Sequence, residues 1–481
     1  MTQVDILFRN AQIIDGSGSA RFAGDVAVSD DRIVALGDLG DPGAWQAGET
    51  VDCAGQILAP GFIDPHTHYD EAVLSDPEMT CAVSQGVTSI INGNCGFSIA
   101  PLTATGPLPA PLASIIDGAG PRFARFSQYR DRLAAEPAAV NSACLIGHGT
   151  LRLNAMDDLG RAADAGEVAA MRRQLDQALD EGALGLSTGT FYPPARAATT
   201  EELIGVSDVL KDYAALYVTH MRDEGDKVVE ALEETLQIGR EAGCGVHVSH
   251  HKCAGLANHG RSEVTLGIID SARQRQDVGL DTTPYIASAT MLNSGRHRQA
   301  SRVIITQSEP FPETAGRDLA DVAAEWGCNL DDAVERLIPA LGIFFIMDER
   351  DVQRILSYPH TMVCSDGIMT GSHPHPRVWG TFPRVLGHYA RKLGLFSMEE
   401  AVHKMTGLPA ARFRLEGRGT LAVDHFADLV IFDETQVVDA ATYETPVRPA
   451  TGIRQVFVNG RRVWQDGEAT GARPGRPLLR A

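Results

Sequence analysis

Six residues with metal-binding side chains stand at the ends of short apolar runs. They are His66, His68, Cys95, His220, His250 and Asp366. His66 and His68 are two residues apart, so both imidazoles point to the same side of an extended strand. Thiolate and imidazole are good zinc ligands at about 2.0–2.3 Å, and a carboxylate is compatible with the same donor set. These residue types therefore predict a zinc site.

Each of these residues taken alone has an ordinary structural explanation. A single cysteine such as Cys95 is most often a small buried core residue, and Asp366 before a glycine is typical of a turn. Their shared position at the ends of apolar runs is the argument for one common site. His148 also ends such a run and is an open candidate, whereas His247 and His251 are predicted to be structural.

The apolar runs that carry these residues alternate with helical patterns. The expected strands are 61–68, 88–96, 141–149, 183–189, 215–220, 245–250, 278–285 and 360–367. The helical patterns at 167–182 and 226–243 each end in glycine, which suits a helix C-cap. Eight strand-then-helix units predict an α/β fold, a parallel (β/α)8 TIM-type barrel over 60–414. Such barrels build their sites at the carboxyl ends of the strands.

Both ends of the chain differ from this middle region. Residues 4–58 and 415–465 carry short alternating apolar runs, and Asn459-Gly460 is a strong hairpin signal. We expect antiparallel strands from both ends to form one small β-sandwich domain of residues 1–59 and 415–481. The long gap before the last barrel strand predicts an insertion at about 286–345 that forms a lid.

Composition excludes several classes of protein. The 481 residues include 42 Lys+Arg and 62 Asp+Glu, and a net charge of −20 argues against nucleic acid and anionic membrane as partners. No apolar stretch approaches the ~18 residues of a membrane span, and the N-terminus lacks the pattern of a signal peptide. The 8 cysteines form no CxxC pair, so we expect free thiols and a cytoplasmic location.

The motifs as a set resemble a known family. PGFIDPHTH, the β-rich ends and Asp366 after the last strand resemble the amidohydrolase superfamily. The segments NGNCGFSIAPL, GALGLSTGTFYPP, THMRDE, VSHHK and CSDG resemble, more specifically, the N-acyl-D-amino acid deacylases (D-aminoacylases). The superfamily's more common bridging ligand is a carboxylated lysine on strand four. Here that strand reads ALGLSTG, and the presence of Cys95 instead is the D-aminoacylase pattern.

This resemblance implies roles for the six residues. One tightly bound zinc is held by Cys95, His220 and His250. A second, weaker divalent-metal position is formed by His66, His68, Asp366 and the bridging Cys95. Zinc makes hydroxide available at neutral pH for attack on the acyl carbonyl, and Asp366 acts as general base and then as general acid. Stabilisation of the oxyanion is left open between Tyr192 and groups bound by His66 or His68.

The small-molecule substrate, an N-acyl-D-amino acid, carries an α-carboxylate that a guanidinium binds best. Arg377 is the predicted clamp, since it resembles the family's carboxylate-binding arginine. Lys252, two residues after His250, and Tyr285 at the end of strand seven are further candidates. Arg296, at the start of the insertion, is a second cation beside Lys252, and it predicts N-acyl-D-glutamate over an apolar substrate. The preference for the D form rests on the resemblance.

Alternative functions remain open at this stage. One is a deacylase for hydrophobic side chains. Another is a cyclic-amide hydrolase of the dihydropyrimidinase kind, which would be expected to carry the missing lysine on strand four. The last is a non-catalytic scaffold, which would be expected to have lost metal ligands that this chain retains. The oligomeric state is not predicted.

Overall fold

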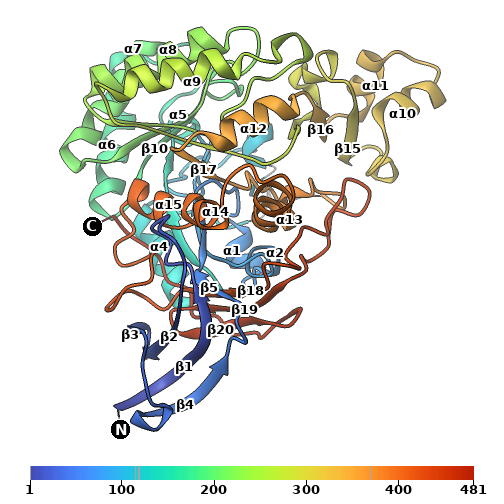
Figure 1. Ribbon diagram of the computed structural model, residues 1–481. Helices are drawn as coiled ribbons and strands as arrows, with labels where there is room; N and C mark the ends of the chain where they lie inside the picture. The colour runs from blue at the N-terminus through green and yellow to red at the C-terminus, as the bar shows by residue number, and fades with distance from the viewer. Residues whose placement is uncertain (1, 114, 117–119, 370, 481) are drawn as a thin grey trace.

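Two parallel sheets form the middle of the molecule (Figure 1). The computed structural model describes residues 2–113, 115–116, 120–369 and 371–480. One sheet has three strands in the order β6-β7-β8. The other has six strands in the order β9-β10-β11-β12-β13-β17. The strand bounds are β6 (Phe62–Asp64), β7 (Val87–Asn92), β8 (Asn141–Cys144), β9 (Ile146–Gly147), β10 (Gly185–Gly189), β11 (Leu216–His220), β12 (Gly245–Val248), β13 (Val278–Thr282) and β17 (Thr361–Val363).

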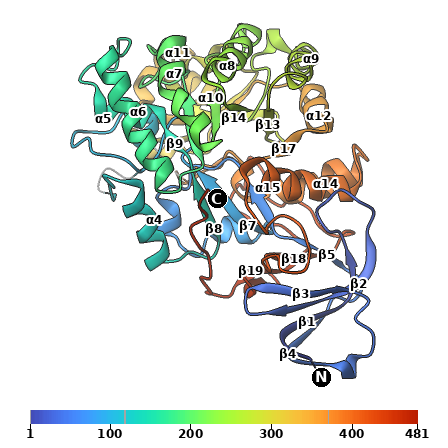
Figure 2. The same cartoon turned by 90° about the vertical axis from the view of Figure 1, so that its left-hand side faces the viewer.

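Helices follow these strands in the chain, and several lie on their outer side (Figure 2). Every residue of β7, β10, β11 and β13 is buried, as in a parallel sheet that is covered on both faces. The main helices are α4 (Phe126–Ala135), α5 (His148–Ala155), α6 (Ala165–Asp180), α7 (Thr200–Ser207), α8 (Val228–Ala242), α9 (Ser262–Arg273), α12 (Glu349–Ser357), α13 (Arg377–Arg384), α14 (Met398–Met405) and α15 (Gly407–Phe413). The shorter helices are α1 (Ala72–Ser75), α2 (Thr80–Val83) and α3 (Ala110–Ala113).

The two helical patterns singled out in the sequence correspond to α6 and α8. Helix α8 ends at Gly243, whose φ of 69° is in the left-handed region that favours glycine at a C-cap. A π-helix (Val385–Lys392) continues α13. Within the described ranges, no helix is both long enough and apolar enough to cross a membrane.

The two parallel sheets are connected at both of their edges. Strands β8 and β9 are separated by the single residue Leu145. At the other edge the backbone N–H of Asp366 donates to the carbonyl of His66, and the N–H of His68 donates to the carbonyl of Gly367, both at 2.9 Å. These bonds join the segment after β6 to the segment after β17. They therefore hold the predicted ligands of the first and last strands side by side.

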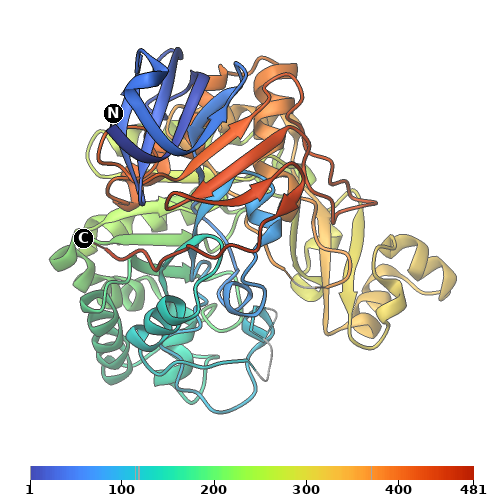
Figure 3. The same ribbon diagram turned by 90° about the horizontal axis from the view of Figure 1, so that it is seen from below.

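Strands from both ends of the chain share one nine-stranded sheet (Figure 3). Its strands are β1 (Thr2–Ile13), β2 (Phe22–Ser29), β3 (Arg32–Gly37), β4 (Trp45–Asp52), β5 (Ile57–Pro60), β18 (Leu429–Phe432), β19 (Ile453–Val458), β20 (Arg461–Gln465) and β21 (Glu468–Ala469). Most pairs are antiparallel, as expected, but β1 pairs with β4 and β5 in parallel. Because β5 pairs with both β1 and β18, the strands form one continuous mixed sheet. The hairpin expected at Asn459-Gly460 joins β19 to β20.

The segment between β13 and β17 carries its own antiparallel sheet, which lies at the upper right in Figure 1. Its elements are β14 (Ala287–Met291), β15 (Val303–Ser308), β16 (Ala340–Phe345), α10 (Leu319–Glu325) and α11 (Leu330–Leu337). This segment coincides with the insertion expected at about 286–345.

A buried carboxylate ties α7 to α5. Glu202 accepts hydrogen bonds from the guanidinium of Arg152, from Nε2 of His148 at 3.1 Å and from the backbone N–H of Ala163 at 2.9 Å. Glu202 is 3% exposed and its two side-chain partners are fully buried. Burial acts to raise the pKa of Glu202, but the hydrogen bonds from His148 and Arg152 outweigh it and lower the pKa to about 2. The open candidate His148 therefore belongs to this structural network.

We expect Glu202→Gln to lower the free energy of unfolding at pH 7 by about 3–5 kcal/mol, because Arg152 would stay buried without its counter-charge. The folded-state pKa lies below the ordinary 4.5, so the stabilisation is complete above about pH 4.5 and is lost as the pH falls toward 2. Urea unfolding across this range measures both effects. Glu136→Gln, in the exposed Arg132–Glu136 pair, should change stability by less than about 0.5 kcal/mol. A loss at Glu202 that does not depend on pH would contradict this explanation.

Candidate metal centre

The thiol of Cys95 lies at the centre of the predicted ligands. Its Sγ is 3.3 Å from Nε2 of His66, 3.3 Å from Nε2 of His250 and 3.7 Å from Nδ1 of His220. These four side chains come from the carboxyl ends of β6, β7, β11 and β12, and each is at most 4% exposed. The fold thus brings together four donors that span positions 66 to 250 of the chain.

The remaining predicted ligands lie against the same cluster. Oδ1 of Asp366 is 3.4 Å from Nε2 of His68 and 3.7 Å from Nε2 of His66. Three sets of side chains have ligand atoms within 4.8 Å of one another. They are His66, Cys95 and His250; His66, His68 and Asp366; and His220, Glu224 and His250. His66 and His250 each belong to two sets, so the sets form one continuous cluster.

Three of the predicted ligands have a strained backbone. Cys95, His250 and Asp366 have φ values of 53°, 34° and 48°, in the left-handed region that side chains other than glycine rarely adopt. Such conformations cost about 1–3 kcal/mol each and persist where surrounding structure imposes them, commonly at functional sites. The backbone strain supports a functional role for this cluster. No pattern in the sequence predicted this strain.

The protonation of the cluster suits a bound cation. Burial lowers the pKa of His66 and His220 well below the ordinary value, so both rings are neutral and keep a lone pair for a metal. Burial raises the pKa of the Cys95 thiol, and a metal ion would offset this by favouring the thiolate. A thiol surrounded by imidazole nitrogens, with a carboxylate beside it, fits zinc.

Sequence analysis missed Glu224, which contacts both cations expected beside the ligands. Its Oε1 lies 2.6 Å from Nζ of Lys252, and its Oε2 lies 2.7 Å from Nη2 of Arg296. Lys252 and Arg296 are therefore paired with a buried carboxylate, whereas the sequence suggested two free cations. Burial acts to raise the pKa of Glu224, but the neighbouring histidines and Lys252 hold it well below the ordinary value. The available signal was its position four residues after His220, within THMRDE.

Asp281 was also missed in the sequence. It lies in β13, is fully buried, and accepts a hydrogen bond from the backbone N–H of His250. Its Oδ2 is 2.7 Å from Nε2 of His247 and 4.0 Å from Nδ1 of His66. His247 thus contacts Asp281, in agreement with the structural role expected for it. His251 contacts Thr265, 2.8 Å away, in the same manner.

The other candidate substrate-binding residues lie at different distances from the cluster. Nη1 of Arg377 lies 2.8 Å from Oδ2 of Asp366, so this buried guanidinium borders the cluster. Burial acts to raise the pKa of Asp366, but Arg377 is the largest opposing influence and the net pKa is well below the ordinary value. The ring of Tyr192 is 4.9 Å from that of His220.

The structure does not bring Tyr285 to the predicted ligands. Its ring packs 5.1 Å from that of His375, and its hydroxyl has no hydrogen-bond partner among the described residues. The chain turns into β14 directly after Tyr285, which carries the side chain away from the strand-end position that the sequence suggested.

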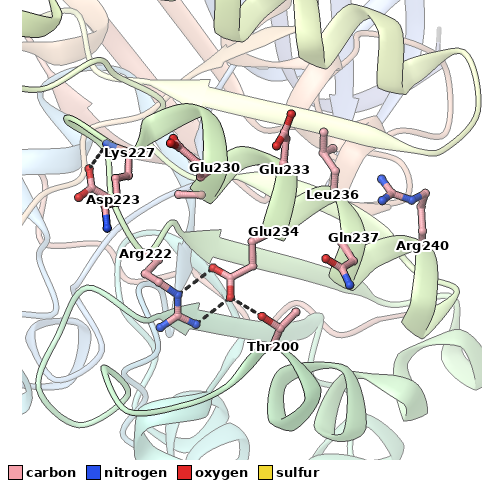
Figure 4. A pocket seen from close by; sticks show the side chains of 11 residues that line it. Thr200, Arg222, Asp223, Lys227, Glu230, Glu233, Glu234, Leu236, Gln237 and Arg240 are labelled. Carbon is pink, nitrogen blue, oxygen red and sulfur yellow. Dashed lines mark hydrogen bonds and ion pairs between the residues drawn. The ribbon is translucent and has the colours of Figure 1, made fainter.

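Two cavities differ in their relation to the cluster. A groove of about 920 Å³ lies along α8 and contains none of the predicted site residues. Figure 4 shows its charged lining, where Arg222 and Thr200 both bind Glu234. A smaller cavity of about 200 Å³ is lined by Glu224, Arg296 and Phe191, so it adjoins the cluster. Of these two cavities, only the smaller one is lined by residues that contact the cluster.

Comparison with known proteins identifies the class. A model of the amidohydrolase family matches residues 49–294 and 329–464. The match covers more than half of the chain, and the chain belongs to the amidohydrolase family. The resemblance carried by PGFIDPHTH and Asp366 is therefore confirmed.

Particular relatives refine this assignment. The chain is 53% identical to D-aminoacylase from Alcaligenes xylosoxydans xylosoxydans, over 99% of this chain and 98% of the relative. It is 51% identical to N-acyl-D-aspartate deacylase from the same organism, over 99% and 95%. The crystal structure of N-acyl-D-glutamate deacylase from Bordetella bronchiseptica, with zinc and a phosphonate mimic of the tetrahedral intermediate, matches with a TM-score of 0.95 at 44% identity, covering 100% of both chains. The finer resemblance to this group is also confirmed.

We expect Cys95→Ala to lose tightly bound zinc, because the thiol is the donor that the surrounding imidazoles share. Elemental analysis after dialysis should give about one zinc per chain for the wild type and less than about a tenth of that for the variant. Cys53→Ala, which removes a buried thiol from the terminal sheet, should keep its zinc. Full zinc content in Cys95→Ala would rule out the ligand assignment.

Proposed function

We propose that this chain is a zinc-dependent hydrolase that cleaves the amide bond of N-acyl-D-amino acids. The observation that carries this proposal is the buried Cys95 thiol ringed by His66, His220 and His250. Relatives at 44–53% identity over essentially the whole chain bear the names of N-acyl-D-amino acid deacylases, and one of them was solved with zinc.

Cys95, His220 and His250 would hold the tightly bound zinc, and His66, His68 and Asp366 a second, weaker metal ion. When bound, zinc supplies Lewis acidity that activates water and polarises a carbonyl group. Asp366 is placed to act on protons, because Arg377 keeps its carboxylate ionised. It takes a proton from the attacking water and returns it to the departing amine, so the products are a carboxylate and a free D-amino acid.

The same cluster offers cations for the substrate. Arg377 is fully buried, and its Nε has no hydrogen-bond partner among the described residues, so it can bind an α-carboxylate while it contacts Asp366. Tyr192 lies beside His220 and is a hydroxyl candidate for stabilising the oxyanion. The position of Tyr285 beside His375 supports no such role for that residue.

We also propose that the preferred substrate side chain is acidic, with glutamate favoured. Lys252 and Arg296 share the single carboxylate of Glu224, so this group retains a net positive charge. Arg296 is 7% exposed, and its Nε and Nη1 have no partner among the described residues. Buried donors of this kind favour an anionic ligand. The alternative, an apolar side chain, is favoured by Phe191, which lies under Arg296 in the same cavity.

The architecture proposed for this function is a closed (β/α)8 barrel of residues 60–414. Two observations support closure of the barrel. Strand β9 follows β8 after a single residue, and hydrogen bonds join the segments after β6 and β17. Residues 1–59 and 415–481 would form a separate small domain, and 286–345 a lid over the site. The free cysteines are consistent with work in the cytoplasm.

A screen of N-acetyl, N-formyl and N-succinyl D- and L-amino acids tests the proposed reaction. We expect release of free amine from D substrates only, with N-acyl-D-glutamate turned over fastest. Asp366→Asn is the matched control, and its kcat should be lower by about 10²–10⁴-fold. Turnover confined to L substrates, or full activity of Asp366→Asn, would contradict the proposal.

Arg296→Ala separates the two possible side-chain preferences. Loss of a charged hydrogen bond of about 1.5–3 kcal/mol should lower kcat/KM for N-acetyl-D-glutamate by about 10–100-fold. The value for N-acetyl-D-leucine should change much less and serves as the internal control. Faster turnover of the leucine substrate by the wild type would instead establish the apolar alternative.

A further inference from the structure

His375 caps the helix that carries the predicted substrate clamp, Arg377. Helix α13 begins at Arg377, and the residue before it, Pro376, offers no side-chain acceptor. The first N–H groups of a helix lack partners within the helix. Here the backbone N–H of Arg377 donates to Nδ1 of His375 at 3.0 Å, and the N–H of Val378 donates to the carbonyl oxygen of His375 at 3.1 Å. One residue thus satisfies the first two donors of α13.

The second ring nitrogen of His375 contacts the segment between β13 and β17. Nε2 lies 3.1 Å from the carbonyl oxygen of Ala287, the first residue of β14. A carbonyl oxygen only accepts and a backbone N–H only donates, so the two bonds require one tautomer, with the proton on Nε2 and the lone pair on Nδ1. Burial lowers the pKa of His375 well below the ordinary value, which agrees with a neutral ring. The imidazole therefore joins the start of α13 to β14.

Two aromatic rings hold this imidazole in place. The ring of Tyr285 lies 5.1 Å from it and the ring of Tyr443 lies 5.3 Å from it, with interplanar angles of 88° and 79°. Such edge-to-face contacts are favourable for aromatic pairs. His375 is 3% exposed, so bulk water has little access to either of its hydrogen bonds. Tyr285 thus packs against the residue that binds the backbone of Arg377.

We propose that His375 is a positioning residue, which holds Arg377 where its guanidinium binds the α-carboxylate of the substrate. The inference rests on the proposed function, because it concerns the same clamp. The guanidinium lies 2.8 Å from Asp366, so the start of α13 sets the distance between the clamp and the general base. A misplacement of about 1 Å can cost about 10²-fold in activity. His375, Arg377 and Thr290 of β14 also line one small cavity, so β14 borders the clamp that His375 holds.

Two substitutions separate the two bonds of the ring. In His375→Asn the side-chain oxygen replaces Nδ1 and still accepts from Arg377, whereas in His375→Gln the side-chain nitrogen replaces Nε2 and still donates to Ala287. Each variant loses one buried hydrogen bond, so both should unfold at a lower urea concentration than the wild type. Only His375→Gln should raise KM for N-acetyl-D-glutamate, by about 10–100-fold, with kcat changed much less, because the α-carboxylate is bound in substrate and transition state alike. His373→Gln, which keeps a donor for the carbonyl of Tyr443, should have the wild-type KM.

A wild-type KM in His375→Gln, or an equal rise of KM in His375→Asn, would overturn the inference and leave the proposed function standing. A second measurement needs no variant and covers the case in which the variants do not fold. Long-range ¹H–¹⁵N spectra of wild-type protein labelled at histidine should show His375 protonated at Nε2 alone. A proton on Nδ1 would overturn the inference. A wild-type protein that hydrolyses no N-acyl-D-amino acid would overturn the proposed function, and with it the role of the clamp, whatever the tautomer of His375.

Discussion

This structure depends on one constraint. A thiol, several imidazoles and several carboxylates must lie close together in a buried space without bulk water. One ring nitrogen of each of His66, His220 and His250 lies within 3.7 Å of Sγ of Cys95. Each comes from a different strand, so the cluster exists only when neighbouring strands are in register. Cys95, His250 and Asp366 have left-handed backbone conformations, which persist only where the surrounding structure imposes them.

Charge compensation around the cluster follows from the same constraint. Buried ions are tolerated when they are paired, and here Glu224 is matched by Lys252 and Arg296, and Asp366 by Arg377. The chain carries a net charge of −20, yet its site is rich in cations. Net charge describes the outer surface, whereas an anionic substrate responds to the local groups that it meets.

The site residues that could be predicted from the sequence are those whose positions follow from the pattern of the strands. His66, His68, Cys95, His220, His250 and Asp366 each end an apolar run, and parallel strands bring such ends together. Glu224 and Asp281 could not be ranked from sequence, because their importance comes from neighbours in other strands. Tyr285, which the strand pattern also suggested, packs against His375 in the structure. In the terminal sheet, alternation identified the strands, but it did not indicate that β1 pairs in parallel with β4 and β5.

The position of β5 has a consequence for how the molecule is made. This strand is synthesised before the whole middle region, but one of its two hydrogen-bonding partners, β18, follows that region in the chain. During translation the free edge of β5 is open to pairing with other chains, as exposed strand edges generally are. The nine-stranded sheet therefore reaches its final pairing only after the middle region has been synthesised. The synthesis of β18, and not the folding of the middle region, sets the earliest moment at which this part of the protein is complete.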